Sequence, residues 1–217
     1  MFYEPIKKNH GLPQNPFNSL VIPRPIGWIT SRDPEGVVNL APYSFFNAVC
    51  YSPPTVMFAS GAGSGEDGLK DSIRNVEATG EFVCNLVTWE NREQMIQTSA
   101  SVHKDVNELE MTGLTSQPGR MVDVPWVAEA PVHLECRYVK SVDLPNWGDK
   151  DRYVVVFGEV IGIHIKDDLI TEEGLVDVGR MHPLGRLATT TTRKWTQTQS
   201  SQWYGQTELS RLQKPAE

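Results

Sequence analysis

Pro23-Arg24-Pro25-Ile26-Gly27-Trp28-Ile29-Thr30-Ser31 is an apolar run that two prolines interrupt. We predict a strand beginning near Ile26, because proline is tolerated at the start or edge of a strand. Turn signals follow at Pro34 and Gly36, and the strand pattern resumes over residues 37–41. This stretch therefore predicts a β-hairpin with a longer loop.

Strand patterns recur along the rest of the chain. Apolar runs predict strands over residues 55–60, 81–87, 132–142 and 152–165, with residues 144–149 as a second hairpin loop. Helical spacing appears only before Gly80 and over residues 91–100. Many strands with few helices indicate a mainly β protein, a barrel or sandwich that carries helical decorations.

The segment Leu69-Lys70-Asp71-Ser72-Ile73-Arg74-Asn75 has the features of a phosphate site. The first turn of a helix leaves backbone N–H groups free and carries partial positive charge. Lys70 and the Ser72 hydroxyl beside such a turn would complete an anion site. The alternative is an ordinary surface helix that Asp71 or Ser72 caps and that ends at Gly80.

The first hairpin also carries polar groups suited to a pocket. Its paired strands would present Thr30 or Ser31 together with Asn39, while Ala41 and Pro42 would let the backbone approach a flat ring. Aromatic side chains would line the apolar edge of that ring; they are Trp28, Phe45 and Phe46. The alternative is a hairpin that packs into the core and keeps its polar residues at the turn.

The composition limits the class of protein. The chain has 217 residues, of which 39% are hydrophobic and 22% charged, as in a globular protein of one large or two small domains. A formal net charge of -7 argues against nucleic-acid binding through a basic face. We also expect no signal peptide and no membrane span. Three widely spaced cysteines argue against a disulfide framework, so we expect a cytoplasmic protein.

Several familiar catalytic and metal motifs do not occur in the sequence. There is no CxxC, HExxH, nucleotide P-loop or GxSxG. His133 and Glu135 fall on one strand face, but two such residues do not make a metal site. We therefore predict no metal ligand and no catalytic acid, base or nucleophile. The glycine-rich residues 61–65 are interpreted as a mobile loop that could cover the pocket.

The composition of the chain changes near its end. Residues 189–192 are threonines, and Gln and Ser dominate residues 197–202. We predict a main domain over residues 1–188 and an extension over residues 189–217. Trp195, Trp203 and Tyr204 would dock this extension on the body or on a partner subunit.

Taken in order, these segments resemble the flavin reductase-like family with an FMN-binding split barrel. The matching stretches are residues 23–31, 39–47, 53–54, 70–75 and 79–87, and the similarity covers roughly residues 10–187. Each piece is weak alone, but the ordered set is specific. Flavoredoxin and the reductase components of two-component monooxygenases are relatives of this type.

The resemblance implies an FMN site with assigned residues. Thr30 and Ser31 look like hydroxyls that reach the phosphate or ribityl chain. The isoalloxazine edge would contact Asn39, Leu40, Ala41 and Ser44. The phosphate end would comprise Ser60, Lys70, Asp71 and Ser72. The resemblance also implies a homodimer, and an NADH- or NADPH-dependent reductase that passes electrons to a monooxygenase or another acceptor.

Other functions remain open at this point. A flavin carrier or redox sensor would use the same pocket without turnover. A related split barrel could instead bind haem or a vitamin B6 phosphate, although no placed histidine favours haem. A β-barrel interaction module with no cofactor is the least specific alternative.

Overall fold

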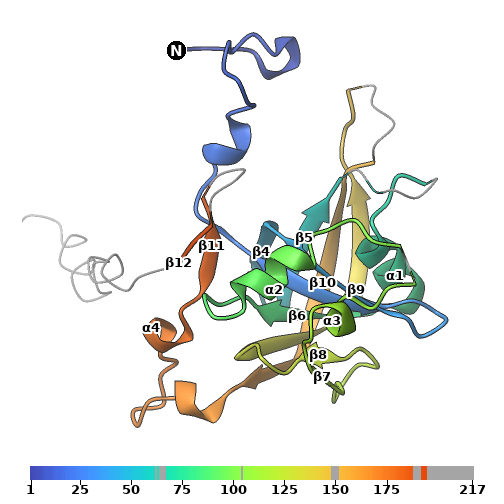
Figure 1. The fold of residues 1–217 in the computed structure, drawn as a ribbon, viewed down its shortest axis with the longest axis vertical. Coiled ribbons are helices and arrows are strands. Elements are labelled where there is room, and N and C mark those ends of the chain that lie inside the picture. The colour runs from blue at the N-terminus through green and yellow to red at the C-terminus, as the bar shows by residue number, and fades with distance from the viewer. Residues whose placement is uncertain (62, 64–66, 104, 148–151, 188–191, 195–217) are drawn as a thin grey trace, which may run out of the picture.

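Antiparallel strands make up most of the structure (Figure 1). The computed structural model describes residues 1–61, 63, 67–103, 105–147, 152–187 and 192–194. The strands are β1 (Arg24–Pro25), β2 (Gly27–Arg32), β3 (Val38–Tyr43), β4 (Phe45–Tyr51), β5 (Pro54–Ser60), β6 (Glu81–Leu86), β7 (Ser116–Gln117), β8 (Trp126–Val127), β9 (Val132–Asp143), β10 (Val154–Ile165), β11 (Leu184–Arg186) and β12 (Thr192–Lys194). The α-helices are α1 (Asp71–Thr79), α2 (Arg92–Gln97), α3 (Glu108–Met111) and α4 (Val178–Met181), with 3-10 turns at Pro5–Lys7, Phe17–Ser19 and Asp167–Leu169.

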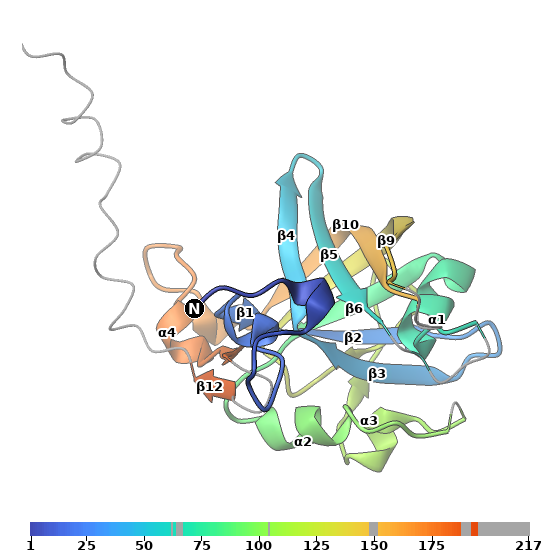
Figure 2. The ribbon, with the colours of Figure 1, turned by 90° about the horizontal axis from the view of Figure 1, so that it is seen from above.

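The main sheet has seven strands in the order β3-β2-β6-β9-β10-β5-β4. β3 and β4 lie at opposite ends of this order, yet only Ser44 separates them in the sequence. The sheet must therefore curl until its two edges approach each other, and β4 contacts β2 while β5 contacts β3 (Figure 2). This open barrel confirms the prediction of a mainly β protein with helical decorations.

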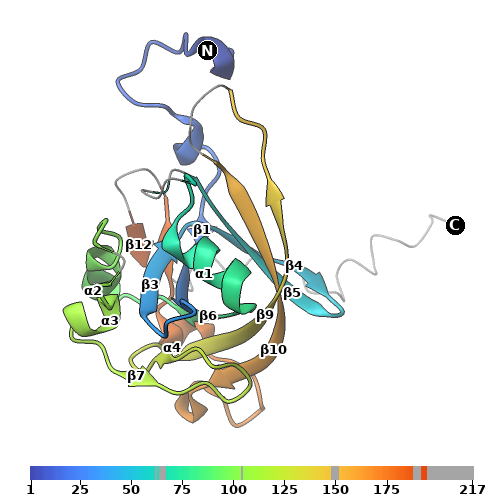
Figure 3. The ribbon, with the colours of Figure 1, turned by 90° about the vertical axis from the view of Figure 1, so that its right-hand side faces the viewer.

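The first predicted hairpin is confirmed. β2 and β3 pair antiparallel, with Thr30 opposite Leu40 and Ser31 opposite Asn39. The second predicted hairpin is formed by the long strands β9 and β10, which pair along their whole length (Figure 3). In both hairpins the strand pattern of the sequence was strong enough to define the elements.

β2 is buried on both of its faces. Successive side chains of a strand point to opposite faces, so Trp28 packs with α2 and α3 residues while Ile29 packs inside the barrel. On the barrel side, Ile73 and Val76 of α1 join the same cluster as Ile29. Helices therefore cover both sides of this part of the sheet.

Aromatic rings fill the barrel core. The Phe58 ring lies 5.1 Å from that of Tyr43 and 5.5 Å from that of Phe82, measured between centroids. Gly158 makes this packing possible, because a Cβ there would lie 2.3 Å from the Phe82 ring. Tyr43 belongs both to this core and to the wall of the cavity described below.

Two of the differences from the predictions concern β4 and α2. β4 was not predicted, because Phe45 to Tyr51 lacks clear alternation and is exposed over most of its length. The helix predicted over residues 91–100 is limited to α2, Arg92–Gln97. The short hydrogen-bonded turns after α2 end it near Thr98.

The N-terminal residues lie outside the barrel. Residues before β1 lead away from it as an arm that carries the two short 3-10 turns (Figures 1 and 3). Of the predicted extension at residues 189–217, only β12 is described, and its backbone pairs with β11. The remainder, including Trp195, Trp203 and Tyr204, lies outside the described residues, so the domain boundary stays a prediction.

Candidate functional site

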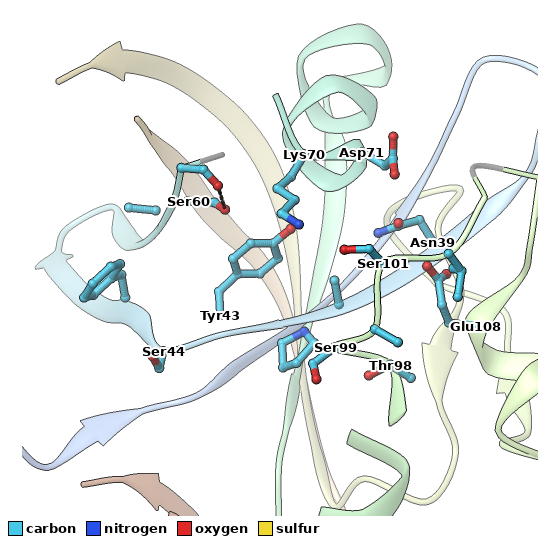
Figure 4. A pocket seen from close by; sticks show the side chains of 17 residues that line it. Asn39, Tyr43, Ser44, Ser60, Lys70, Asp71, Thr98, Ser99, Ser101 and Glu108 are labelled. Carbon is cyan, nitrogen blue, oxygen red and sulfur yellow. Dashed lines mark hydrogen bonds between the residues drawn. The ribbon is translucent and has the colours of Figure 1, made fainter. Parts of the chain in front are cut away.

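A cavity of about 270 Å³ opens where β3, the end of β5 and the start of α1 meet (Figure 4). A segment that follows α2 closes its remaining side. The lining comprises Asn39, Ala41, Pro42, Tyr43, Ser44, Phe45, Ala59, Ser60, Gly61, Lys70, Asp71, residues 98–102 and Glu108. The cavity therefore brings together segments that are far apart in the sequence.

One end of the cavity carries positive charge. Lys70 is the N-cap residue of α1, and its side chain extends into the cavity toward Tyr43 (Figure 4). No side chain caps this helix, so its first backbone N–H groups have no side-chain acceptor. A lysine beside an uncapped helix N-terminus is suited to bind an anion such as a phosphate.

The prediction that Asp71 or Ser72 caps α1 is wrong. The Asp71 carboxylate instead accepts a hydrogen bond from Arg74, with Nη1 2.5 Å from Oδ1. The Ser72 hydroxyl is buried and accepts from the Asn39 side-chain amide at 2.7 Å. Both side chains are thus used away from the helix end, while the predicted glycine at its C-terminal end, Gly80, is confirmed with φ +78°.

The side of the cavity formed by β3 and β5 carries several small or apolar side chains. Ala41, Pro42 and Ala59 contribute small or rigid side chains, and Phe45 adds an aromatic ring. Tyr43 is buried, and its burial raises the pKa of the phenol, an effect that the nearby Asp71 and Glu108 reinforce. The phenol is therefore neutral, and this side suits a planar, partly apolar group.

Glu108 gives the opposite side of the cavity an acidic group, which sequence reasoning missed. Its side chain is buried, and the backbone N–H of Leu40 donates to Oε2 at 3.0 Å. Burial, with a smaller contribution from Asp71, raises the pKa of this carboxyl. The only local signal was Asn107, whose side chain caps α3 by accepting from Leu109 N, and that signal says nothing about Leu40.

Hydroxyl groups after α2 were missed as well. Thr98, Ser99 and Ser101 line the cavity on the same side as Glu108 (Figure 4). Trp28 does not line it, contrary to prediction; it is buried in the core, and its indole N–H donates to Thr98 Oγ1 at 2.9 Å. Phe46 packs against the barrel core and is also not part of the lining, whereas Phe45 is.

The predicted site residues divide into two groups. Those that line the cavity are Asn39, Ala41, Ser44, Ser60, Lys70 and Asp71. Those that do not are Thr30, Ser31, Leu40 and Ser72, and all four are buried. The assignment of any of these residues to a cofactor stays a prediction.

Two of these buried residues, Ser31 and Ser72, support the cavity wall through hydrogen bonds. The Asn39 amide donates to Ser72 at 2.7 Å and approaches Ser31 Oγ at 3.5 Å. Asn75 of α1 donates to the same Ser31 oxygen at 3.3 Å. This network joins α1 to β2 and β3, and thereby holds Asn39 at the edge of the cavity.

Other kinds of site find little support in the described part of the chain. Among its residues there is no group of three or more His, Cys, Asp or Glu side chains placed to hold a metal ion. Nor do the described ranges contain a helix with the length and apolar character that a bilayer span requires. Cys50, Cys84 and Cys136 are free thiols. The glycine-rich loop includes residues 62 and 64–66, which lie outside the described residues.

Comparison with known proteins identifies the family. The model for the flavin reductase like domain matches residues 19–185. An uncharacterized protein from Aquifex aeolicus is 38% identical over 168 residues, which are 77% of this chain and 82% of that protein.

Solved structures agree with this match. Nitrilotriacetate monooxygenase component B from Bacillus cereus is 30% identical with a TM-score of 0.77, covering 86% of this chain and 96% of that one. A protein with a split barrel domain from Shewanella frigidimarina is 23% identical with a TM-score of 0.72, and the match covers 82% of this chain and 85% of that one. At this identity the likeness supports the fold alone. The chain is a split barrel that belongs to the flavin reductase-like family.

Proposed function

We propose that this protein is an FMN-binding oxidoreductase that transfers hydride from NADH or NADPH to flavin and electrons onward to an acceptor. The observation that carries the proposal is that one cavity combines Lys70 and an uncapped helix N-terminus with a side lined by Ala41, Pro42, Phe45 and Ala59. A phosphate at one end and a planar ring at the other match the chemistry of FMN. Membership of the flavin reductase-like family supports the same assignment.

The residues present are suited to hold this cofactor. Lys70 and the first N–H groups of α1 would bind the phosphate, and Ala41 and Pro42 would let the β3 backbone approach the ring. FMN would supply the redox chemistry by accepting a hydride and releasing electrons. The protein would orient the two reactants and keep water from the ring. Because this chemistry needs no acid–base residue, our prediction of no catalytic side chain stands as part of the proposal.

The test is the visible spectrum of the FMN-loaded protein before and after anaerobic addition of NADH or NADPH. Bleaching of the flavin absorbance would support a reductase. The donor that bleaches the flavin faster, NADH or NADPH, would be the one that the enzyme prefers. A bound flavin that stays oxidised with both donors would instead indicate a carrier or sensor. A purified protein that binds no FMN would contradict the proposal.

The acceptor belongs to the same proposal. Nitrilotriacetate monooxygenase component B, a relative at 30% identity, is named as one component of a monooxygenase system. This supports a protein partner that receives electrons or reduced flavin. Oxygen-dependent consumption of NADH that increases when such a monooxygenase component is added would support this role, and unchanged consumption would argue against it.

We further propose that the chain forms a homodimer through the exposed edge of the sheet. β4 ends the strand order, and its apolar side chains are exposed, including Val49 at 49% and Tyr51 at 100%. An exposed apolar edge strand favours association with another chain. Light scattering on the eluted protein should give twice the mass of the chain, and Val49→Lys should shift it toward the monomer. A monomeric wild-type protein would refute this.

The cytoplasm is the compartment that we propose for the protein. The support is chemical: Cys50, Cys84 and Cys136 are all free thiols, as expected in a reducing compartment. Fractionation of cells that express a tagged protein would test this, and recovery outside the cytoplasmic fraction would contradict it.

A further inference from the structure

Arg74 of α1 lies beside the anion end of the cavity and binds both of the acidic side chains there. Its Nε and Nη2 donate to the two carboxylate oxygens of Asp67 at 3.1 and 2.9 Å. Its Nη1 donates to Asp71 at 2.5 Å, and Nη2 also reaches the carbonyl oxygen of Leu69 at 3.2 Å. We call Asp67, Asp71 and Arg74 the Arg74 cluster. These three residues lie on both sides of Lys70 in the sequence, and Lys70 is not one of the cluster.

The cluster determines the backbone path that leads into Lys70. Asp67 Oδ1 also accepts the N–H of Leu69 at 3.0 Å, and the N–H of Gly63 donates to Gly68 O at 2.9 Å. The contact at Gly63 is so close that a Cβ there would lie 1.6 Å from Leu69 O. Since Arg74 connects the Asp67–Leu69 turn to α1, the position of the Lys70 side chain depends on this arginine.

The cluster also sets the charge near the cavity. Asp71 lines the cavity, and an uncompensated carboxylate there would repel a phosphate. Hydrogen bonding and charge from Arg74, together with the Leu69 N–H, lower the pKa of Asp67 to about 2, so the Asp67 carboxylate is ionised. Arg74 donates to both acids and offsets one of their two negative charges, which reduces the repulsion that a phosphate at Lys70 would meet.

We propose that Arg74 is a positioning residue that gives the cavity its preference for phosphorylated over unphosphorylated flavin. The proposal rests on the function proposed above, because it takes the Lys70 end as the phosphate site. Arg74 itself is not part of the cavity lining and would act through Lys70 and Asp71. Its effect should therefore appear with FMN and be small with riboflavin, which has the same ring and no phosphate.

The experiment measures dissociation constants of the full-length protein for FMN and for riboflavin by quenching of flavin fluorescence. We expect Arg74→Gln to weaken FMN binding about tenfold and riboflavin binding less than about twofold. Arg74→Lys keeps the charge and should retain part of the FMN preference. Adding Asp71→Asn to Arg74→Gln should recover part of the lost FMN affinity, because it removes the carboxylate left beside the phosphate but does not replace the arginine that positions Lys70.

A matched control is Arg92→Gln, which removes another ion-paired arginine, here bound to Glu93, outside the cavity lining. It should leave both affinities unchanged, and melting temperatures would verify that each variant is folded. Equal weakening of FMN and riboflavin by Arg74→Gln would show a merely structural role and overturn the inference. An FMN-to-riboflavin ratio of dissociation constants that is the same in Arg74→Gln and in the wild type would also overturn it. A wild-type protein that binds neither flavin would instead refute the proposed function.

Discussion

Lowering the pH from neutral should destabilise this protein through one buried histidine, His133 on β9. Its side chain is 2% exposed, and Nδ1 lies 2.9 Å from Asn85 Oδ1. That oxygen can only accept, and it also accepts the Val127 N–H at 2.9 Å, so we assign the ring proton to Nδ1. Burial, with added repulsion from His164 and Lys166, lowers the pKa of His133 from 6.5 to about 4.

The sign and size of the effect follow from this difference. Between pH 6.5 and about pH 4 the unfolded chain carries a proton on His133 that the folded protein does not. Stability rises with pH wherever the unfolded state binds more protons, so it must fall as the pH decreases through this window. Integration gives a loss of about 2 kcal/mol between about pH 7 and about pH 5, and about 3 kcal/mol once both states are protonated.

Urea unfolding followed by tryptophan fluorescence at a series of pH values would measure this loss. His133→Asn retains a donor toward Asn85 but does not titrate. Its free energy of unfolding should therefore not show the loss of about 2 kcal/mol between about pH 7 and about pH 5 that His133 causes in the wild type. His103→Asn is the control, because the His103 side chain is 72% exposed, and its pH dependence should match that of the wild type. If His133→Asn and the wild type showed the same pH dependence, the reasoning would be refuted.

Three further changes test the cavity and the core. Lys70→Ala should weaken FMN binding about tenfold to hundredfold by removing a charged phosphate partner, and unchanged affinity by calorimetry would show that the phosphate binds elsewhere. Glu108→Gln keeps an acceptor for Leu40 N and removes a carboxyl whose pKa is raised above 4.5. A raised carboxyl pKa makes the wild-type free energy of unfolding fall as the pH rises from 4.5 through the pKa of the folded state. Urea titrations of the variant at a series of pH values should not show this fall. The same pH profile in the variant and the wild type would contradict the raised pKa. Phe58→Ala should cost about 3–5 kcal/mol of stability in thermal unfolding, since the ring is fully buried in the barrel core, and a loss below about 1 kcal/mol would show that the site collapses around the deletion.

The local elements were predictable because their patterns are periodic. β2 and β3, the long pair β9 and β10, and α1 with Gly80 at its end all follow from apolar spacing and turn residues. β4 was not predictable in this way, because an exposed edge strand has no buried face to impose alternation. The prediction of the α1 cap was also wrong, because the Asp71 and Ser72 side chains bind Arg74 and Asn39 instead of the helix end.

The candidate site was only partly predictable for a related reason. The sequence indicates which residues can bind phosphate or approach a ring, and Lys70, Asn39 and Ala41 do line the cavity. It does not indicate which side of a strand faces a cavity when both sides are buried, as in β2. Thr30 and Ser31 accordingly proved to be buried and hydrogen-bonded within the protein.

By itself the sequence determined the strands with a strong apolar pattern, the main helix, the family resemblance and the lysine at the anion end, because these depend on short-range patterns and on residue chemistry. The tertiary structure decided the rest of the cavity. Glu108 meets Leu40 across a separation of 68 residues, and Ser99 and Ser101 reach the same cavity from the segment after α2, where the helix predicted over residues 91–100 has already ended. These contacts depend on how far the sheet curls and on where α2 and α3 pack, and no local pattern in the chain encodes either.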